Sequence, residues 1–339
     1  MTQPEAKKRR QLWIGIVVSA IGLASIFYFV KPSQIIDALK SARYGYVGLS
    51  IIGIVIFMLL RALRWRFMLN NDVPYWELFH IQSIGAMLTN TLPFRIGDIA
   101  RAVMIGSVPP VTIARGVSTM VVERILDMMF IVTLLPFTLA EVVRLPDWMR
   151  SGARASGILA IGATAIVILA ANNRKLAGRI ATWTLDRIRF LDTDTWVSRV
   201  DELLAGLSSL THLKDGLILL VYSVVIWIPI IAAYYAVLLA VNIQPTWPMA
   251  GFVVCAAALS IAAPSSPGQI GVFHAGVLAA LAVMGQPEAE SASFAFLYHA
   301  LNVLMMVILG SIGFIRTGAT FGQVVASAQK FMKRSDSTP

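Results

Sequence analysis

Three charged residues, Glu123, Arg124 and Asp127, interrupt an otherwise apolar stretch of the chain. Glu123 and Asp127 are four positions apart and Arg124 and Asp127 are three apart, so on a helix the three would share about one face. A charge in the middle of a membrane-spanning helix costs ~3 kcal/mol on insertion scales, so these side chains should face protein or water. We expect them to pair with one another and with Arg95 or Arg101. An internal ion-pair network and a substrate or proton role fit the pattern equally well.

A second charged set follows Pro93 and consists of Arg95, Asp98 and Arg101. Asp98 and Arg101 are three positions apart and would share a helix face. The helix predicted to begin near Gly97 also directs its free amide groups toward the preceding break. Two arginines beside a helix N-terminus can bind an anionic group such as phosphate. The alternative is that these arginines flank the membrane on its cytoplasmic side and contact lipid headgroups there.

This charged set belongs to one of two similar breaks in hydrophobic stretches. The first reads Leu-Pro-Phe-Arg-Ile-Gly-Asp over 92–98, and the second reads Pro-Ser-Ser-Pro-Gly-Gln-Ile-Gly over 264–271. Both contain Pro-x-[Arg/Gln]-Ile-Gly. Each flanking apolar arm has only about a dozen residues, whereas a helix needs ~20 to cross the hydrocarbon core. Proline removes a backbone donor and glycine weakens a helix, so each segment should turn back within the membrane.

The position of the two breaks suggests what they form together. They lie about half a chain length apart, and irregular backbone inside a membrane must line a cavity or be buried in protein. Interrupted segments at corresponding positions of two halves indicate a substrate site between structural repeats. The alternative is two kinked core helices whose sequences match by chance.

Other candidate residues carry weaker signals. Arg61, Arg64 and Trp65 end an apolar stretch, where arginine and tryptophan are ordinary interfacial anchors. His274 follows the second break, and His299 lies in the last long apolar stretch. We expect each histidine to be a hydrogen-bonded packing residue, with a proton carrier as the alternative.

The composition is that of a polytopic membrane protein. Hydrophobic residues make up 57% of the 339 residues and charged residues 14%, with a mean hydropathy of +0.74, whereas a soluble domain carries about 25% charged residues. The net charge of +10 comes mainly from residues that flank apolar stretches and set orientation, so it does not indicate nucleic-acid binding. No nucleophile elbow, phosphate loop, metal-spaced His/Cys set or dinucleotide fingerprint is visible. We therefore expect no enzymatic activity, metal or cofactor.

The apolar stretches predict an all-α fold of about six transmembrane helices plus two re-entrant hairpins. Residues 1–339 would form one membrane domain, with repeat halves at 12–140 and 156–315. Each half then has three crossings, an odd number, so the halves have opposite orientation and form an inverted repeat. The six spans are predicted at 12–30, 46–64, 117–140, 156–171, 217–241 and 291–315.

The distribution of basic residues favours re-entrance. If the N-terminus is inside and both broken segments turn back, most of the 28 Lys and Arg lie on the cytoplasmic side, as the positive-inside rule requires. Both termini and the connector 172–214 are then cytoplasmic. We predict an amphipathic helix pair on the membrane surface for 172–214, with a soluble connector as the alternative, and a disordered tail at 333–339. The basic residues left outside are Lys31, Lys40, Arg43, Arg144, Arg150 and Arg154.

Four motifs, in order along the chain, resemble those of a known family. They read Arg61-x-x-Arg64-Trp65, Asn90-Thr91-Leu92-Pro93-x-Arg95-x-Gly97-Asp98-x-x-Arg101, Val122-Glu123-Arg124-x-x-Asp127 and Pro264-x-x-Pro267-Gly268-x-Ile270-Gly271. Over roughly 12–320 the chain resembles the flippase-like family typified by the transmembrane region of lysylphosphatidylglycerol synthase. That family also includes membrane proteins associated with hopanoid synthesis and archaeal glycosylation. The resemblance implies a lipid-translocating domain with two re-entrant segments. Asp98 stands where many members of the family have Glu. His274 stands near a second position at which many members have Glu.

The sequence therefore predicts a transporter of the inner membrane that moves a polar-headed lipid of anionic, polyprenyl or hopanoid type between leaflets. One rival is a membrane-embedded glycosyl- or headgroup-transferase, and another is a non-catalytic scaffold for lipid-biosynthesis enzymes. The expected ligand is a membrane lipid, with no nucleic acid as partner, and the lipid's identity and the oligomeric state stay open. The residues predicted to contact substrate are Asn90, Pro93, Arg95, Gly97, Asp98, Arg101, Pro267, Gly268, Gly271 and His274.

Overall fold

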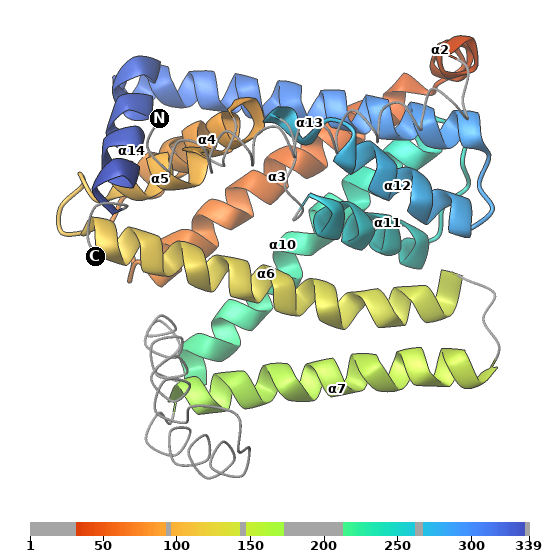
Figure 1. Ribbon diagram of the computed structural model, residues 1–339, viewed down its shortest axis with the longest axis horizontal. Helices are drawn as coiled ribbons and strands as arrows, with labels where there is room; N and C mark the ends of the chain where they lie inside the picture. The colour runs from red at the N-terminus through yellow and green to blue at the C-terminus, as the bar shows by residue number, and fades with distance from the viewer. Residues whose placement is uncertain (1–31, 93–95, 143–146, 173–212, 262–266, 336–339) are drawn as a thin grey trace, which may run out of the picture.

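The computed structural model describes residues 32–92, 96–142, 147–172, 213–261 and 267–335. Every regular element in these ranges is helical (Figure 1), which confirms the all-α prediction for this part of the chain. Three of its helices are long and apolar enough to cross a membrane: Tyr44–Met68, Lys214–Ala240 and Glu288–Thr317. These coincide with the spans predicted at 46–64, 217–241 and 291–315.

The described elements fall into two sets along the chain. The first set is α2 (Pro32–Lys40), α3 (Tyr44–Met68), α4 (Tyr75–Thr91), α5 (Ile96–Ile105) and α6 (Ile113–Val142). The second set is α7 (Asp147–Asn172), α10 (Leu213–Ala240), α11 (Trp247–Ser260), η3 (Pro267–Gln269), α12 (Val272–Val283), α13 (Glu288–Thr317) and α14 (Phe321–Ser335). Helices α6 and α7 include the stretches predicted as spans at 117–140 and 156–171.

Helices α3 and α10 form the centre of the fold. They pack along each other and run diagonally in Figure 1, whereas α6, α7 and α13 follow the long axis. Helix α4 packs on α13, and α11 packs on α6. The pair α4 and α5 lies toward one end of the molecule and the pair α11 and α12 toward the other (Figure 1).

Both predicted breaks are interruptions between short helices. Helix α4 ends at Thr91 and α5 begins at Ile96, while α11 ends at Ser260 and α12 begins at Val272. Each helix packs against its partner across the break, so the chain reverses direction there. In the second break Gly268 and Gly271 have φ angles of 75° and 85°, a backbone conformation that glycine adopts without a steric penalty.

Close backbone contact holds the first pair together. A Cβ atom at Gly97 of α5 would overlap the carbonyl oxygen of Gly85 and the backbone of Thr89 on α4. In the second pair, a Cβ at Gly276 of α12 would overlap the side chain of Ser260 on α11. Small residues therefore set the separation of the two helices in both pairs, which is the usual device of membrane helix packing.

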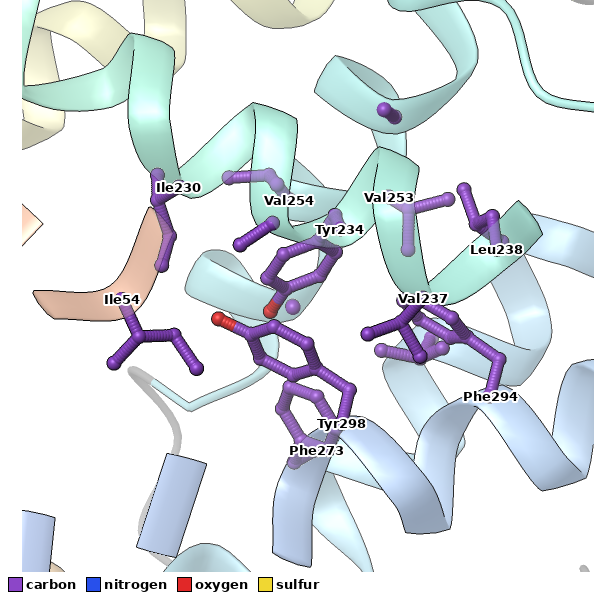
Figure 2. Packing of buried hydrophobic residues seen from close by; sticks show 14 of the residues in the cluster. Ile54, Ile230, Tyr234, Val237, Leu238, Val253, Val254, Phe273, Phe294 and Tyr298 are labelled. Carbon is purple, nitrogen blue, oxygen red and sulfur yellow. The ribbon is translucent and has the colours of Figure 1, made fainter. Parts of the chain in front are cut away.

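The largest buried cluster is built mainly by α10, α11, α12 and α13. Figure 2 shows the rings of Tyr234, Phe273 and Tyr298 packed together in it, with the two tyrosine oxygens near each other. The ring centroids of Tyr234 and Tyr298 are 4.0 Å apart, and their hydroxyl groups point toward each other (Figure 2). Buried tyrosines of this kind satisfy their polar end internally while the ring fills the core.

Other predictions lie outside the described residues or differ from the structure. The first span at 12–30 and nearly all of the connector 172–214 lie outside the described residues. The tail predicted as disordered from 333 is wrong at its start, because α14 extends through Ser335; residues 336–339 lie outside the described ranges. Helix α14 was not predicted at all. It carries too many polar residues to stand out as an apolar stretch, yet it is amphipathic and packs on α5.

Candidate functional site

A cavity of about 260 Å³ lies where the two breaks meet near the centre of the molecule. The element η3 contacts α4, and a Cβ atom at Gly268 would lie 3.4 Å from the carbonyl oxygen of Asn90. Residues from both halves therefore line one space. On the side of the first break they include Arg61, Gln82, Thr89, Asn90, Asp98, Arg101, Arg124 and Asp127. On the side of the second break they include Trp227, Tyr234, Gln269, Phe273, Tyr298, His299 and Asn302.

Glu123 is the centre of a buried charge network beside this cavity. Its carboxylate accepts hydrogen bonds from Arg61, whose Nε lies 2.9 Å away, and from Arg101. A third arginine, Arg64, has its Nη2 3.5 Å from the same carboxylate. A carboxylate removed from water in this way is stabilised only by such charged partners. Helices α3, α5 and α6 are thus joined through one side chain.

Asp127 extends the network by one helical turn. Its Oδ1 lies 2.8 Å from Nη2 of Arg64, and Arg64 also donates to the hydroxyl of Ser223 on α10 at 3.1 Å. The Arg64 side chain is 0% exposed. Removal of Arg64 or Asp127 would deprive its partner of this buried ion pair, which is more costly than removal of an exposed pair.

Arg124 lies apart from this network and pairs with Asp98. Its Nη2 is 3.2 and 3.1 Å from the two carboxylate oxygens of Asp98. The expectation that Arg124 pairs with Glu123 or Asp127 is therefore wrong. Consecutive residues on a helix point about 100° apart, so Arg124 cannot share the direction of Glu123. The Arg124 and Asp98 side chains are 43% and 23% exposed, and both line the cavity.

The assignment of Arg61, Arg64 and Trp65 as interfacial anchors is also wrong. Arg61 and Arg64 belong to the buried network, and Trp65 is fully buried. The Trp65 Nε1 donates to the hydroxyl of Thr119 at 3.0 Å, and the guanidinium of Arg101 lies 4.1 Å from the centre of its ring. Arginine and tryptophan at the end of an apolar stretch look the same in sequence whether they face lipid or protein, so only the packing distinguishes the two cases.

The first-break residues divide into two groups. Pro93 and Arg95 lie outside the described residues, so their predicted contact with substrate stays a prediction. Asp98 and Arg101 are brought together at the cavity as predicted, but Arg101 is almost fully buried and its Nη2 is held by Glu123. Among the described residues, the more exposed Arg124 is therefore the cation best placed to contact a bound anionic group.

The second break presents a neutral surface to the cavity. His299 lines the cavity, whereas His274 is buried behind it and is 2% exposed. The prediction that His274 contacts the substrate directly is therefore wrong. The Gly271 amide donates to Nδ1 of His274 at 3.3 Å, and Nε2 of His274 lies 3.4 Å from Nδ1 of His299. Nε2 of His299 in turn lies 2.8 Å from the carbonyl oxygen of Gly268. The prediction that both histidines are hydrogen-bonded is confirmed.

Sequence reasoning missed several residues that the fold brings to the cavity. Gln82 and Thr89 face it from α4, and Gln269 faces it from the second break. Within the described ranges, Gln82 Oε1, Thr89 Oγ1 and Arg101 Nε are buried without a hydrogen-bond partner. Polar residues two turns apart on α4 were the available signal.

Apolar helices around a central cavity with one charged wall define an integral membrane protein. The chain belongs to the family described as the lysylphosphatidylglycerol synthase TM region, whose family model matches residues 12–310. This confirms the resemblance drawn from the four motifs.

Two curated relatives are similar over part of the chain. A UPF0104 membrane protein of Methanothermobacter thermautotrophicus is 25% identical over 182 residues, which are 51% of this chain and 54% of that protein. The glycosyltransferase AglD of Haloferax volcanii is 24% identical over 133 residues, 38% of this chain and 21% of AglD. The match thus spans about half the length of the first relative and about a fifth of the second. No solved structure matches the chain.

Proposed function

We propose that this protein is a lipid transporter that moves a lipid with an anionic polar head between the leaflets of the inner membrane. The observation that carries the proposal is the cavity at the meeting point of the two breaks, with three arginines and two aspartates on one wall and aromatic, amide and imidazole groups on the other. A polar headgroup could occupy it while the acyl or polyprenyl tails stay in lipid. Arg124 and Asp98 form the half-exposed pair that such a headgroup would meet.

The arrangement behind this function is an inverted repeat of six spans and two re-entrant hairpins. The pairing of elements supports it, because several contacts among the described helices occur in corresponding pairs. The pair α4–α13 corresponds to α11–α6, and α5–α6 corresponds to α12–α13, while α3 and α10 pack on each other. The outer ends of the two hairpins lie at opposite ends of the long axis (Figure 1). Interrupted helices in this arrangement are typical of secondary transporters.

The same geometry supports the proposed orientation. The end of α7, the loop between α5 and α6, and α14 all lie at one end of the long axis in Figure 1. In the proposed topology that end is cytoplasmic, as the distribution of basic residues predicts. Exposed apolar side chains along the outside of the bundle, such as Leu49, Ile158 and Leu159, suit contact with acyl chains.

The rival function is a membrane-embedded transferase, the activity in the printed name of AglD. A transferase that activates an acceptor hydroxyl needs a general base, and a free carboxylate is one candidate for that role. Within the described residues, the three carboxylates nearest the cavity, Asp98, Glu123 and Asp127, are each paired with arginine. This favours a role in binding and structure for them, and we propose that the protein is not an enzyme.

Reconstitution tests the proposal directly. The purified chain would be placed in vesicles that contain a trace of fluorescent phosphatidylglycerol, with no sugar or aminoacyl donor present. Dithionite added outside quenches only outward-facing probe, so transport is the additional quenching that protein-free vesicles lack. We expect transport together with an unchanged mass of the probe lipid. Quenching no greater than in protein-free vesicles would contradict the proposal, as would a chemically altered probe.

A further inference from the structure

The hydrogen-bonded chain at the second break has a direction that its two ends determine. The amide of Gly271 can only donate, and the carbonyl of Gly268 can only accept. Because Gly271 donates to Nδ1 of His274, that ring carries its proton on Nε2 and donates to Nδ1 of His299. His299 then carries its proton on Nε2 and donates to Gly268. Both imidazoles are neutral, and every donor in this series of hydrogen bonds faces one acceptor.

This series of hydrogen bonds cannot accept another proton without losing one bond. A histidinium has N–H groups on both nitrogens and accepts no hydrogen bond. An added proton on His274 would point at the amide of Gly271, and one on His299 would point at the Nε2 proton of His274. In either case two donors face each other and one link must break.

Two observations decide which link breaks. His274 caps the N-terminus of α12 by accepting from the Gly271 amide, and the positive end of the helix dipole disfavours a cation there. His274 is also 2% exposed, whereas His299 lines the cavity. The added proton therefore belongs on Nδ1 of His299. While the Gly271 amide keeps the proton of His274 on Nε2, the added proton leaves the bond to Gly268 in place and breaks the hydrogen bond between the two rings, which is one of the contacts that join α12 to α13.

We propose that His299 is a proton-binding site and that its occupation breaks the hydrogen bond between His274 of α12 and His299 of α13 at the second break. The state with the link broken binds one more proton than the state with the link made, so a fall in pH favours the broken state. Its use as a coupling step in lipid movement rests on the function proposed above. The proton site itself does not depend on that function.

The surroundings of the pair are largely uncharged. Helix α13 contributes Tyr298, α10 contributes Tyr234 and α11 contributes Cys255, all buried. On α4, His80 lies beside the rings of Trp76 and Phe79. On α2, the exposed Asp37 and Lys40 pair with each other. The charged groups across the cavity are Arg61, Asp98, Arg101, Arg124 and Asp127. Each of them forms an ion pair with a residue of opposite charge.

Hydrogen exchange followed by mass spectrometry on the full chain in phospholipid nanodiscs tests this site. The measurement is the protection of amides in peptides that cover 267–275, corrected for the intrinsic effect of pH, between about pH 8 and about pH 4, a range that extends below the one in which an exposed histidine titrates. We expect protection to fall by about three- to tenfold at the lower pH, the equivalent of one hydrogen bond. In His299→Gln the protection should stay constant with pH. The matched control His80→Gln should behave like the wild type.

Two results would overturn the inference. One is protection at 267–275 that does not change with pH in the wild-type protein. This result does not depend on whether any variant folds. The other is a pH-dependent loss that persists unchanged in both His299→Gln and His274→Gln. A pH-dependent loss that needs His299, seen in a protein that moves no lipid at any pH, would support the proton site and contradict the proposed function.

Discussion

The two breaks share a sequence motif and a place in the fold, but they differ in the chemistry around them. With the two motifs aligned, Asp98 and Arg101 of the first correspond to Val272 and Ala275 of the second. The buried Arg64 and Glu123 correspond, at the same offset, to Leu238 and Leu297. The first break is attached to a buried network of ion pairs, whereas the second is attached to apolar packing and a chain of neutral hydrogen bonds.

This difference suggests a division of roles. A network of buried charges resists change, because separation of a pair removes a favourable contact from charges that have no water to replace it. Neutral hydrogen bonds at 3.3 and 3.4 Å, with glycine at both ends of the chain, hold more weakly and can break locally. We expect the first break to be the fixed binding wall and the second to be the part that moves.

The greatest loss of stability should come from a change in the fixed wall. Arg64→Leu should reduce the free energy of unfolding by about 3–5 kcal/mol, because it leaves Asp127 and Glu123 short of a buried partner. Thermal or denaturant unfolding of the purified protein measures this. Arg115→Leu is a matched control, since its pair with Asp72 is about one-third exposed and should change stability by about 0–1 kcal/mol.

A second substitution shows whether the loss at Arg64 comes from its ion pair. In the double variant Arg64→Leu/Asp127→Leu one charge of each sign is removed, so the loss should be smaller than the sum of the two single losses. Strict additivity of the two losses would show that these residues do not interact, and the contrast between a charged and a neutral break would then lose its basis.

A smaller effect is expected from glycines at corresponding positions of the two breaks. Gly97→Ala should destabilise the protein by about 1–3 kcal/mol through overlap with Gly85 and Thr89 on α4. Gly271→Ala should cost a similar ~1–3 kcal/mol for a different reason, because its φ is 85°. A replacement by Asn, which tolerates positive φ, should recover part of the loss at 271 and none at 97. Equal behaviour of Asn at both positions would show that the two glycines have the same role.

The breaks could be predicted from the sequence because their cause is local. Proline and glycine interrupt a helix wherever they occur, and the short apolar arms follow from counting residues. The presence of a charge network was also predictable, since Glu123, Arg124 and Asp127 cannot face lipid. The pairing was not, because Arg64 and Asp127 meet only after α3 packs against α6. His274 and His299 lie 25 positions apart, and nothing in the sequence indicates that their rings meet beside the second break.

Arg124 provides the most direct test of the proposal that the headgroup passes between the two breaks. Its side chain is 43% exposed at the cavity and lies outside the network around Glu123, so Arg124→Gln should change stability by less than about 1 kcal/mol. The decisive measurement is the rate of fluorescent phosphatidylglycerol transport in reconstituted vesicles. Arg154→Gln, which loses an exposed pair with Glu141 at the far end of α6, is the matched control.

We expect Arg124→Gln to slow this transport about ten- to a hundredfold, the loss expected for one charge-assisted hydrogen bond to the headgroup, while Arg154→Gln transports at the wild-type rate. A lysine at position 124 should restore the rate only in part, because it lacks the planar, two-pronged geometry of arginine. Transport by a folded Arg124→Gln protein at the wild-type rate would contradict the proposal that the headgroup meets the charged wall of this cavity.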